Sequence, residues 1–462
     1  MQGNEKLERF LERYPHRHRL FFERPHVTRR QFFTLAGAGV TGSFLARRAA
    51  AGEVVHQVPV TMQNKAHNVI FILLAGAASH VDTFDFKMVE GATPSSFNPA
   101  KVSGLDWPTG LLPKLAQNLP DMAIVRSMRS WALQHGLAQV WAQIGRSPAG
   151  ALGDIAPNIG SVVAIEKERE RQSSQVFPTF LALNSGGAIG SGYLSAAYAP
   201  MKINPATSGL PDTINVDGAA RFESKWSLLN ALDAPLRVNS PIGADTEDYD
   251  GFYKSAKGLM YNPVVDQAFR YTTAESQRYG NTGFGNACVV AQKVLAANQG
   301  TRFVQITIGG WDHHQNIYDA NGLPRLARQL DDGLSTMLTD LKANGLLNET
   351  LVVMMGEFGR TVGRLSAQNG RDHFLQQFVV FAGGGVRGGR AIGSTNATGA
   401  ATAEFGWSRD RDVRPEDVEA TIYSALGINW TTVRYDDPFG RGFEYVPYAN
   451  QDVYGPINEL WA

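Results

Sequence analysis

The sequence predicts an α/β fold with a mainly parallel central sheet, and two patterns support this prediction. Short apolar segments recur along the chain, and segments with helical spacing of apolar residues separate them. Continuous apolar runs suit strands that helices cover on both faces of a sheet. The expected strands are residues 68–74, 122–126, 179–183, 302–308, 350–355 and 377–382, and the expected helices are residues 138–144, 158–171, 285–298, 323–344 and 415–426.

The composition allows a large globular core and excludes several classes of protein. Of 462 residues, 43% are apolar, and 43 Lys and Arg balance 43 Asp and Glu. Disorder and an extended nucleic-acid surface are therefore not expected. The single cysteine, Cys288, cannot pair within the chain, which excludes a disulfide scaffold.

The first 51 residues differ from the others in charge and in motif. They contain 10 Lys and Arg against 4 Asp and Glu. The pair Arg29-Arg30 precedes a mild apolar run over residues 34–46, which a second basic pair and small residues follow. This segment resembles a twin-arginine export signal with a long n-region, and the glycines in its apolar run disfavour the alternative, an amphipathic helix.

The export signal leads to expectations about partners and location. The twin-arginine translocation machinery is an expected partner, and the mature chain, residues 52–462, is expected in the periplasm or outside the cell as a single domain. Export by this route usually follows folding, which favours a protein that takes up a metal or cofactor in the cytoplasm. No later segment reaches roughly 18 apolar residues, so we expect no permanent membrane span.

A loop with possible metal ligands follows the first expected strand, residues 68–74. It contains His80, Asp82 and Asp85 among small residues. In open α/β sheets, ligands bind outside the carboxyl ends of the strands, because loops and helix N-termini converge there. His80 and Asp82 are therefore candidate metal ligands.

Two glycine-rich regions have no recognisable catalytic motif. Residues 184–250 are rich in Gly, Ser, Pro and Asn with little periodicity, which predicts an insertion or covering loop region. Residues 383–389 lack the Lys-Ser/Thr of a P-loop, so we expect a tight turn there rather than an anion cradle. Because no dinucleotide fingerprint opens a helix after the first strand, an oxidoreductase of that type is disfavoured.

Three further groups of polar side chains lie beside expected strands. One follows the strand expected to end at residue 308, one follows residues 350–355, and one precedes residues 377–382. A single Asp or His at a strand end is usually a cap or a loop hydrogen bonder, but a metal explains the conjunction better. The groups are Asp312 with His313 and His314, Glu357 with Arg360, and Arg371 with Asp372 and His373.

The ligand types restrict the choice of metal. Carboxylate oxygen and neutral imidazole nitrogen suit Zn²⁺, Mn²⁺, Mg²⁺ or Ca²⁺. Neighbouring His313 and His314 point apart in an extended segment, so only one of them needs to face the metal. The expected direct ligands are Asp312, His314, Glu357 and His373, with His80, Asp82 and Asp372 as second choices.

Two arginines lie next to these ligand groups. Arg360 and Arg371 could each anchor a sulfate, phosphate or carboxylate through a bidentate guanidinium. The alternative, a salt bridge that holds a ligand carboxylate, has equal support.

Motifs spread over essentially the whole chain resemble one family. They are Ser79-His80-Val81-Asp82-Thr83-Phe84-Asp85, Gly192-Tyr193-Leu194 with Tyr198-Ala199-Pro200, Arg278-Tyr279-Gly280, Gly309-Gly310-Trp311-Asp312, Gly356-Glu357-Phe358-Gly359-Arg360-Thr361, Gly370-Arg371-Asp372-His373 and Gly383-Gly384-Gly385. Together they resemble the domain-of-unknown-function 1501 family, which is grouped with the alkaline phosphatase and sulfatase superfamily. The resemblance implies an alkaline-phosphatase-like, three-layer fold and a metal site.

The superfamily resemblance also directs attention to His135. Gly145-Arg146-Ser147-Pro148 looks like the end of the helix that carries the nucleophile in sulfatases. Counting back ten residues from Gly145, His135 occupies the nucleophile position. The superfamily normally attacks with a Ser, Thr or formylglycine oxygen, so His135 would instead be a metal ligand, a general acid or base, or an imidazole nucleophile.

These observations predict an exported, metal-dependent hydrolase. The resemblance implies a small-molecule or polysaccharide ester of sulfate or phosphate as the substrate, cleaved through metal-activated water. The alternative is a non-catalytic envelope protein that binds an anionic glycan in a retained metal pocket. Turnover of an ester would discriminate between the two.

Overall fold

The computed structural model describes residues 54–56, 60–186, 189–237 and 244–462. One compact unit comprises Val55–Val433 and Phe443–Ala462, and Arg434–Gly442 belongs to a second unit. Within Arg434–Gly442, the Asp437 carboxylate accepts backbone N–H groups from Phe439 and Gly442 and so closes a turn. The expected export signal over residues 1–51 lies outside the described residues.

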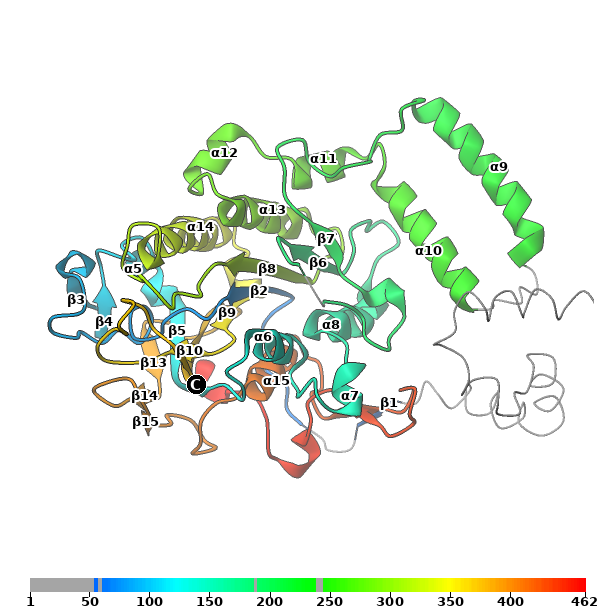
Figure 1. The fold of residues 1–462 in the computed structure, drawn as a ribbon. Coiled ribbons are helices and arrows are strands. Elements are labelled where there is room, and N and C mark those ends of the chain that lie inside the picture. The colour runs from blue at the N-terminus through cyan, green and yellow to red at the C-terminus, as the bar shows by residue number, and fades with distance from the viewer. Residues whose placement is uncertain (1–53, 57–59, 187–188, 238–243) are drawn as a thin grey trace, which may run out of the picture. The chain divides into compact units, whose positions relative to one another are not determined.

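An eight-stranded sheet forms the centre of the large compact unit (Figure 1). Its strands, in chain order, are β2 (Asn68–Ala75), β5 (Met122–Arg129), β6 (Phe180–Leu183), β7 (Met201–Ile203), β8 (Phe303–Gly309), β9 (Thr350–Gly356), β12 (Gln376–Gly383) and β13 (Arg390–Ile392). They lie side by side in the order β13-β5-β12-β9-β2-β8-β6-β7. Only β12 is antiparallel to its neighbours, so the predicted α/β fold with a mainly parallel sheet is confirmed.

Helices cover both faces of the sheet. They are α5 (Leu115–Asn118), α6 (His135–Ile144), α7 (Ala151–Asp154), α8 (Ile159–Lys167), α11 (Pro263–Phe269), α12 (Thr273–Arg278), α13 (Gly283–Ala297), α14 (Leu323–Ala343) and α15 (Pro415–Ala425). Figure 1 shows α13 and α14 on one face, and α8 and α15 on the other. All five expected helices are present, each within a few residues of its expected ends.

The side chains of β2 explain why the sheet has a core on each face. Ile70 and Ile72 pack in the core that contains α13 and α14. Val69 and Phe71 pack in the core that contains α8 and α15. Successive strand residues point to opposite faces, so a strand that is buried on both sides must be apolar at every position. Each such side chain contributes roughly 1.5–3 kcal/mol by leaving water.

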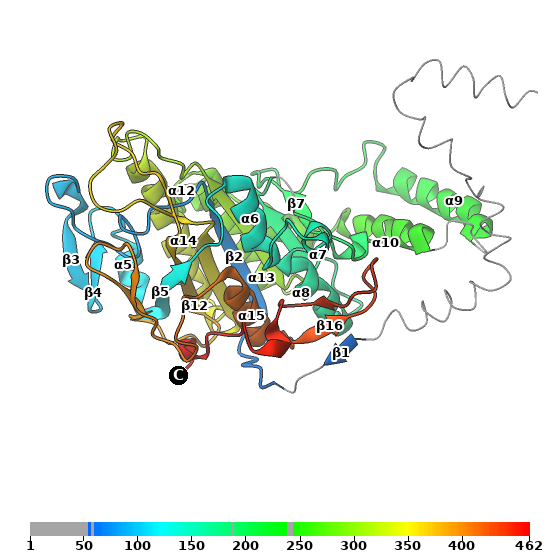
Figure 2. The ribbon, with the colours of Figure 1, turned by 60° about the horizontal axis from the view of Figure 1, so that its bottom comes forward.

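The region of residues 184–250 differs from the loop region expected there. It includes α9 (Ala219–Arg237) and the first turns of α10 (Ala244–Leu259), which lie side by side (Figures 1 and 2). These segments contain good helix formers, and Leu228 and Leu232 of α9 are exposed. The helices contradict a loop over this whole region, whereas the other expectation, an insertion, stays a prediction.

Short strands and turns complete the described fold. The strands are β1 (Val54–His56), β3 (Pro99–Val102), β4 (Leu105–Pro108), β10 (Gly359–Arg360), β11 (His373–Phe374), β14 (Ser394–Thr395), β15 (Thr402–Glu404), β16 (Thr432–Arg434) and β17 (Phe443–Glu444). After β12, the Val386 N–H donates to the Gly383 carbonyl and closes a turn. Among the described helices, none combines the length and apolar character needed to cross a membrane.

The pairing register brings five connecting segments to one edge of the sheet. Ala75 at the end of β2 lies opposite Gly309 of β8, and Leu74 lies opposite Gly356 of β9. Because β12 runs in the opposite direction, its first residue, Gln376, pairs with Arg129 at the end of β5. The segments after β2, β5, β8 and β9 and the segment before β12 therefore meet at this edge.

Candidate metal centre

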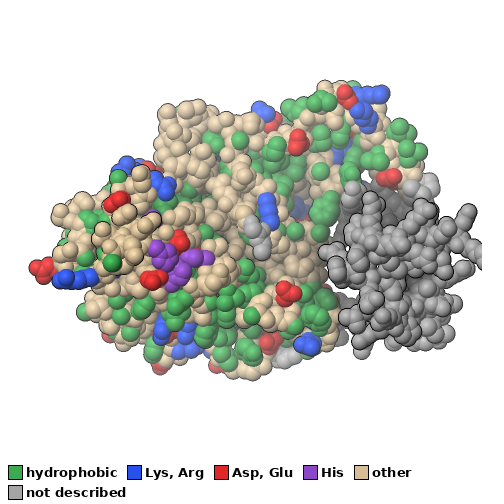
Figure 3. Space-filling model, viewed as in Figure 1, with side chains coloured by type: hydrophobic (Ala, Val, Ile, Leu, Met, Phe, Trp, Pro, Cys, Tyr) green, Lys and Arg blue, Asp and Glu red, His purple; other side chains and the backbone are tan. Residues whose placement is uncertain are grey.

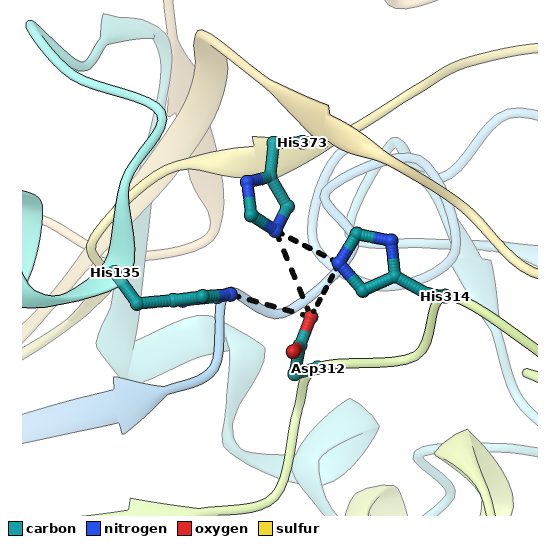
Figure 4. A group of neighbouring side chains, drawn as sticks. All are labelled: His135, Asp312, His314 and His373. Carbon is teal, nitrogen blue, oxygen red and sulfur yellow. Dashed lines mark hydrogen bonds and ion pairs between the residues drawn. The ribbon is translucent and has the colours of Figure 1, made fainter.

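Four side chains meet at the carboxyl edge of the sheet (Figure 4). His135, Asp312, His314 and His373 each offer one ligand atom, and these atoms all lie within 4.8 Å of one another. We call these four residues the His/Asp cluster. Its members come from three separate segments, so only the folded sheet can assemble it.

Asp312 lies at the centre of the His/Asp cluster. Its Oδ1 is 3.3 Å from Nε2 of His135, 3.0 Å from Nε2 of His314 and 3.7 Å from Nε2 of His373. The Nε2 atoms of His314 and His373 are 2.9 Å apart. All three imidazoles therefore present the same ring nitrogen to one carboxylate oxygen.

Each member is positioned by the element next to it. His135 is the first residue of α6, which the Gln134 side chain caps by accepting the Leu137 N–H. Asp312 and His314 lie in the loop after β8. His373 begins β11, where it pairs with Arg360 of β10.

Two glycines permit close approach of these segments. A Cβ on Gly76 would lie 2.7 Å from the backbone nitrogens of Trp311 and Asp312. A Cβ on Gly370 would lie 2.0 Å from the His314 carbonyl. Larger residues at these two positions would push away the loop that carries Asp312 and His314.

The other ring nitrogen, Nδ1, of each imidazole also has a partner. Nδ1 of His135 is 2.6 Å from Glu357 Oε1, and Nδ1 of His373 is 2.6 Å from the Leu133 carbonyl. Nδ1 of His314 lies 3.3 Å from the Asp372 carboxylate. An acceptor at Nδ1 favours the tautomer with its proton there, which leaves the Nε2 lone pair facing the cluster.

Glu357 lies behind His135 rather than among the ligand atoms of the cluster. Its carboxylate is 1% exposed and accepts the Gly76 N–H at 3.0 Å. It also accepts from Nε2 of Gln139 at 3.2 Å. The structure therefore places this expected direct ligand where it orients His135.

The His/Asp cluster is open to solvent, although the groups behind it are buried. The side chains of Asp312 and His314 are 44% and 45% exposed, and those of His135 and His373 are 26% and 21% exposed. Figure 3 shows histidine side chains gathered with acidic ones on the surface. A small molecule can therefore reach the cluster from solvent.

At two of these residues, Asp312 and His373, electrostatics favour the state that a cation requires. Burial raises the pKa of the Asp312 carboxyl, but the hydrogen bond and positive charge of Arg360 outweigh burial and leave this pKa below its usual value. Burial lowers the pKa of the His373 imidazole, and the charge of Arg360 lowers it further. Asp312 is therefore ionised and His373 neutral near pH 7.

Arg360 is fully buried and braces the site from within. Its guanidinium donates to Asp312 Oδ1 at 2.5 Å, to the Ala77 carbonyl at 2.9 Å and to the Arg371 carbonyl at 3.2 Å. It also donates to the Gly76 carbonyl. Its Nη1 also lies 3.5 Å from Nε2 of His314. This arrangement matches the salt-bridge alternative for Arg360, because every N–H group of the guanidinium has a partner among the described residues.

Arg371 is also fully buried. It donates to both oxygens of Asp82, at 2.7 and 3.2 Å, and to the Tyr318 hydroxyl at 3.0 Å. The carbonyls of Thr361 and Gly363 accept its remaining N–H groups. Asp82 is therefore held in an internal ion pair with Arg371, away from the His/Asp cluster.

The remaining predicted residues lie around the cluster. His80 is fully buried, its Nε2 lies 2.9 Å from the Gly399 carbonyl, and burial lowers its pKa. The Asp372 side chain is 74% exposed, lies 3.3 Å from Nδ1 of His314 and accepts the backbone N–H of His373 at 3.0 Å. His313 is not a member of the cluster, as its alternation with His314 predicts.

Two supporting contacts were not anticipated from the sequence. Gln139 stands four residues after His135, and this helical spacing places both on one face of α6, towards Glu357. That spacing could have predicted the position of Gln139 from the sequence. The contact between the Leu133 carbonyl and His373 could not be predicted from the sequence, because every residue has a backbone carbonyl.

Several solved structures are similar to this chain. The PsFucS1 sulfatase from Pseudoalteromonas sp. is 12% identical with a TM-score of 0.39, and the match covers 79% of this chain and 68% of that one. A protein in the alkaline phosphatase superfamily from Vibrio parahaemolyticus is 10% identical with a TM-score of 0.39, over 85% and 75% of the two chains. A phosphonate monoester hydrolase of Agrobacterium radiobacter is 11% identical with a TM-score of 0.36, over 78% and 73%.

The sequence itself matches one family. No curated protein matches it. The model for the family described as protein of unknown function (DUF1501) matches residues 66–451, which include every member of the His/Asp cluster. The chain therefore belongs to the DUF1501 family.

Proposed function

We propose that the protein binds one divalent cation at the His/Asp cluster and hydrolyses a sulfate or phosphate ester there. The distances within the cluster support binding. Ligands about 2.1 Å from a tetrahedral ion lie roughly 3.4 Å apart. The separations of 2.9 to 3.7 Å that are measured from Asp312 and between His314 and His373 bracket this value.

The hydrogen-bonding pattern also supports a cation. With protons on Nδ1, the Nε2 atoms of His314 and His373 are two lone pairs only 2.9 Å apart. Nε2 of His135 is buried and has no hydrogen-bond partner among the described residues. A cation between the Nε2 atoms of His314 and His373 would bind both lone pairs, and Nε2 of His135 would remain available to accept a proton.

The donor set favours some of the expected metals over others. Imidazole nitrogen suits Zn²⁺ and related transition metals, whereas Mg²⁺ and Ca²⁺ prefer oxygen ligands. Two imidazoles and one carboxylate therefore favour Zn²⁺, with Mn²⁺ next, among the four expected ions.

We assign holding of the ion to Asp312, His314 and His373, and proton transfer to His135. Catalytic zinc sites commonly use three protein ligands and keep one position open. His135 is the imidazole whose Nδ1 is bound by a buried carboxylate, that of Glu357. This pairing fixes the ring and stabilises the imidazolium that forms when Nε2 accepts a proton.

The proposed chemistry is hydrolysis by water. When bound, a divalent cation would polarise the ester and make water a better nucleophile. Nε2 of His135 would take the proton from the attacking water and return it to the leaving oxygen, while Glu357 keeps the ring in place. The open face of the cluster would admit the ester and the water.

The test is turnover by the metal-loaded mature protein. The chain of residues 52–462 is stripped with a chelator, reloaded with Zn²⁺, Mn²⁺, Mg²⁺ or Ca²⁺, and assayed against sulfate and phosphate mono- and diesters. We expect turnover with Zn²⁺ or Mn²⁺. Metal binding without turnover of any ester would reject the hydrolase and favour the alternative, an envelope protein that binds an anionic glycan.

We also propose that residues 1–51 direct export through the twin-arginine pathway. The Arg29-Arg30 pair before a glycine-containing apolar run supports this proposal. A folded, metal-loaded protein is a suitable substrate for that route.

A further inference from the structure

We propose that Arg414 and Glu416, at the start of α15, are positioning residues for the His/Asp cluster. They hold the loop of residues 130–134, which leads into His135 and braces His373. The effect of Arg414 and Glu416 on metal binding rests on the proposed function, whereas their effect on the loop does not.

Glu416 binds the chain on both sides of His135. Its carboxylate is buried, 3% exposed, and accepts Nε1–H of Trp131 at 3.0 Å and Nε1–H of Trp141 at 2.9 Å. The two indoles use different carboxylate oxygens. One carboxylate thereby fixes the loop before His135 to the helix after it.

Arg414 acts on the same loop from the residue that caps α15. Its guanidinium carbon lies 3.9 Å from the centre of the Trp131 ring, a cation–π contact. It also donates to the carbonyls of Arg129 at 3.2 Å and Ser130 at 3.0 Å. Both residues at the start of α15 therefore bind residues 129–131.

The loop passes this restraint on to the cluster. The Ser130 hydroxyl donates to the Glu357 carbonyl at 2.6 Å. The Leu133 carbonyl lies 2.6 Å from Nδ1 of His373. A displaced loop would move His135 directly, and would move His373 and Glu357 through these contacts.

The first experiment measures amide hydrogen exchange of residues 129–135 in Glu416→Gln. The new amide keeps one acceptor oxygen but replaces the other with a donor, so one indole loses its partner. We expect exchange in this loop to be faster by roughly tenfold, as the loss of one charge-assisted hydrogen bond implies.

Glu419→Gln is the matched control. Glu419 is also buried on α15, but its carboxylate lies beside Gly145, at the other end of α6. Exchange at residues 129–135 should stay at the wild-type rate in this variant. If Glu416→Gln does not fold, Trp131→Phe removes the indole N–H that joins the loop to Glu416, keeps an aromatic ring beside Arg414, and should accelerate the same amides.

The second experiment measures Zn²⁺ affinity by competition with a chelator. Glu416→Gln should bind Zn²⁺ roughly tenfold more weakly, because loss of a contact behind the ligands of a metal site weakens affinity by about tenfold or more. Glu419→Gln should bind Zn²⁺ with wild-type affinity. Wild-type loop exchange in both Glu416→Gln and Trp131→Phe would overturn the proposal, as would equal acceleration in Glu419→Gln. A wild-type protein without Zn²⁺ affinity would contradict the proposed function, and the exchange result would still decide the role of Glu416.

Discussion

Replacing Asp312 by alanine should greatly weaken metal binding while the fold is kept. Its Oδ1 is the atom on which three imidazole Nε2 atoms converge at 3.0 to 3.7 Å. The variant keeps His314 and His373 but loses the proposed anionic ligand. It also leaves the positive charge of buried Arg360 next to the site, and this charge repels the metal ion.

The size of the effect follows from these contacts. Removing an outer partner of a metal site costs 10–100-fold in affinity, so a direct ligand should cost at least about 10²-fold, or about 2.7 kcal/mol. Arg360 loses one acceptor but keeps the carbonyls of Gly76, Ala77 and Arg371. Because Asp312 is 44% exposed, the cost to folding should stay near 1 kcal/mol.

The assay is calorimetric titration of the stripped protein with Zn²⁺, with a competing chelator for tight binding. Asp266→Ala is the matched control, because Asp266 is 43% exposed and pairs with an arginine, Arg270, at 3.1 Å. We expect wild-type affinity in the control. Unchanged Zn²⁺ affinity and stoichiometry in folded Asp312→Ala would refute the assignment of Asp312 as a ligand.

Three further predictions address catalysis, export and pH. His135→Ala should retain Zn²⁺ but lose on the order of 10²-fold or more in turnover, the scale of a positioned acid or base, and full activity would remove His135 from the mechanism. Quenching turnover of a phosphate ester with alkaline denaturant, in which a P–N bond survives, checks the alternative of an imidazole nucleophile, which would appear as phosphohistidine. Arg29→Lys with Arg30→Lys should leave the protein in the cytoplasm in cell fractionation, and normal export would reject the signal. Burial raises the pKa of Glu419 to about 8, so the folded protein binds its proton more tightly than the unfolded chain does. The free energy of unfolding should then fall between about pH 4.5 and pH 8, by on the order of 3–5 kcal/mol for this group. Denaturant melts of Glu419→Gln at pH 5, 7 and 9 should lack this decrease. An equal pH dependence of the free energy of unfolding in the two proteins would contradict the raised pKa of Glu419.

The sheet could be predicted from sequence because its strands are buried on both faces. The continuous apolar run of β2 is readable without knowledge of its neighbours. The order and direction of the strands are not readable in this way. His373 lies just before β12 in the sequence. It reaches the same edge of the sheet as Asp312 only because β12 runs antiparallel to its neighbours.

The residue types of the candidate site were predictable, but the positions of only some of its side chains were. Asp312, His314 and His373 meet as expected at strand ends. Glu357 and Arg360 also follow a strand that ends at this edge, yet both side chains are buried behind the ligand atoms. Whether a polar side chain faces solvent or the interior depends on packing of loops that no local pattern specifies.

The most direct test of the central claim is anomalous X-ray diffraction from crystals of the Zn²⁺-loaded protein, recorded on both sides of the zinc edge. We predict one peak per chain, within about 2.0–2.2 Å of the Asp312 carboxylate and of Nε2 of His314 and His373. A zinc peak elsewhere, with none at the His/Asp cluster, would contradict the claim that this cluster is the metal centre.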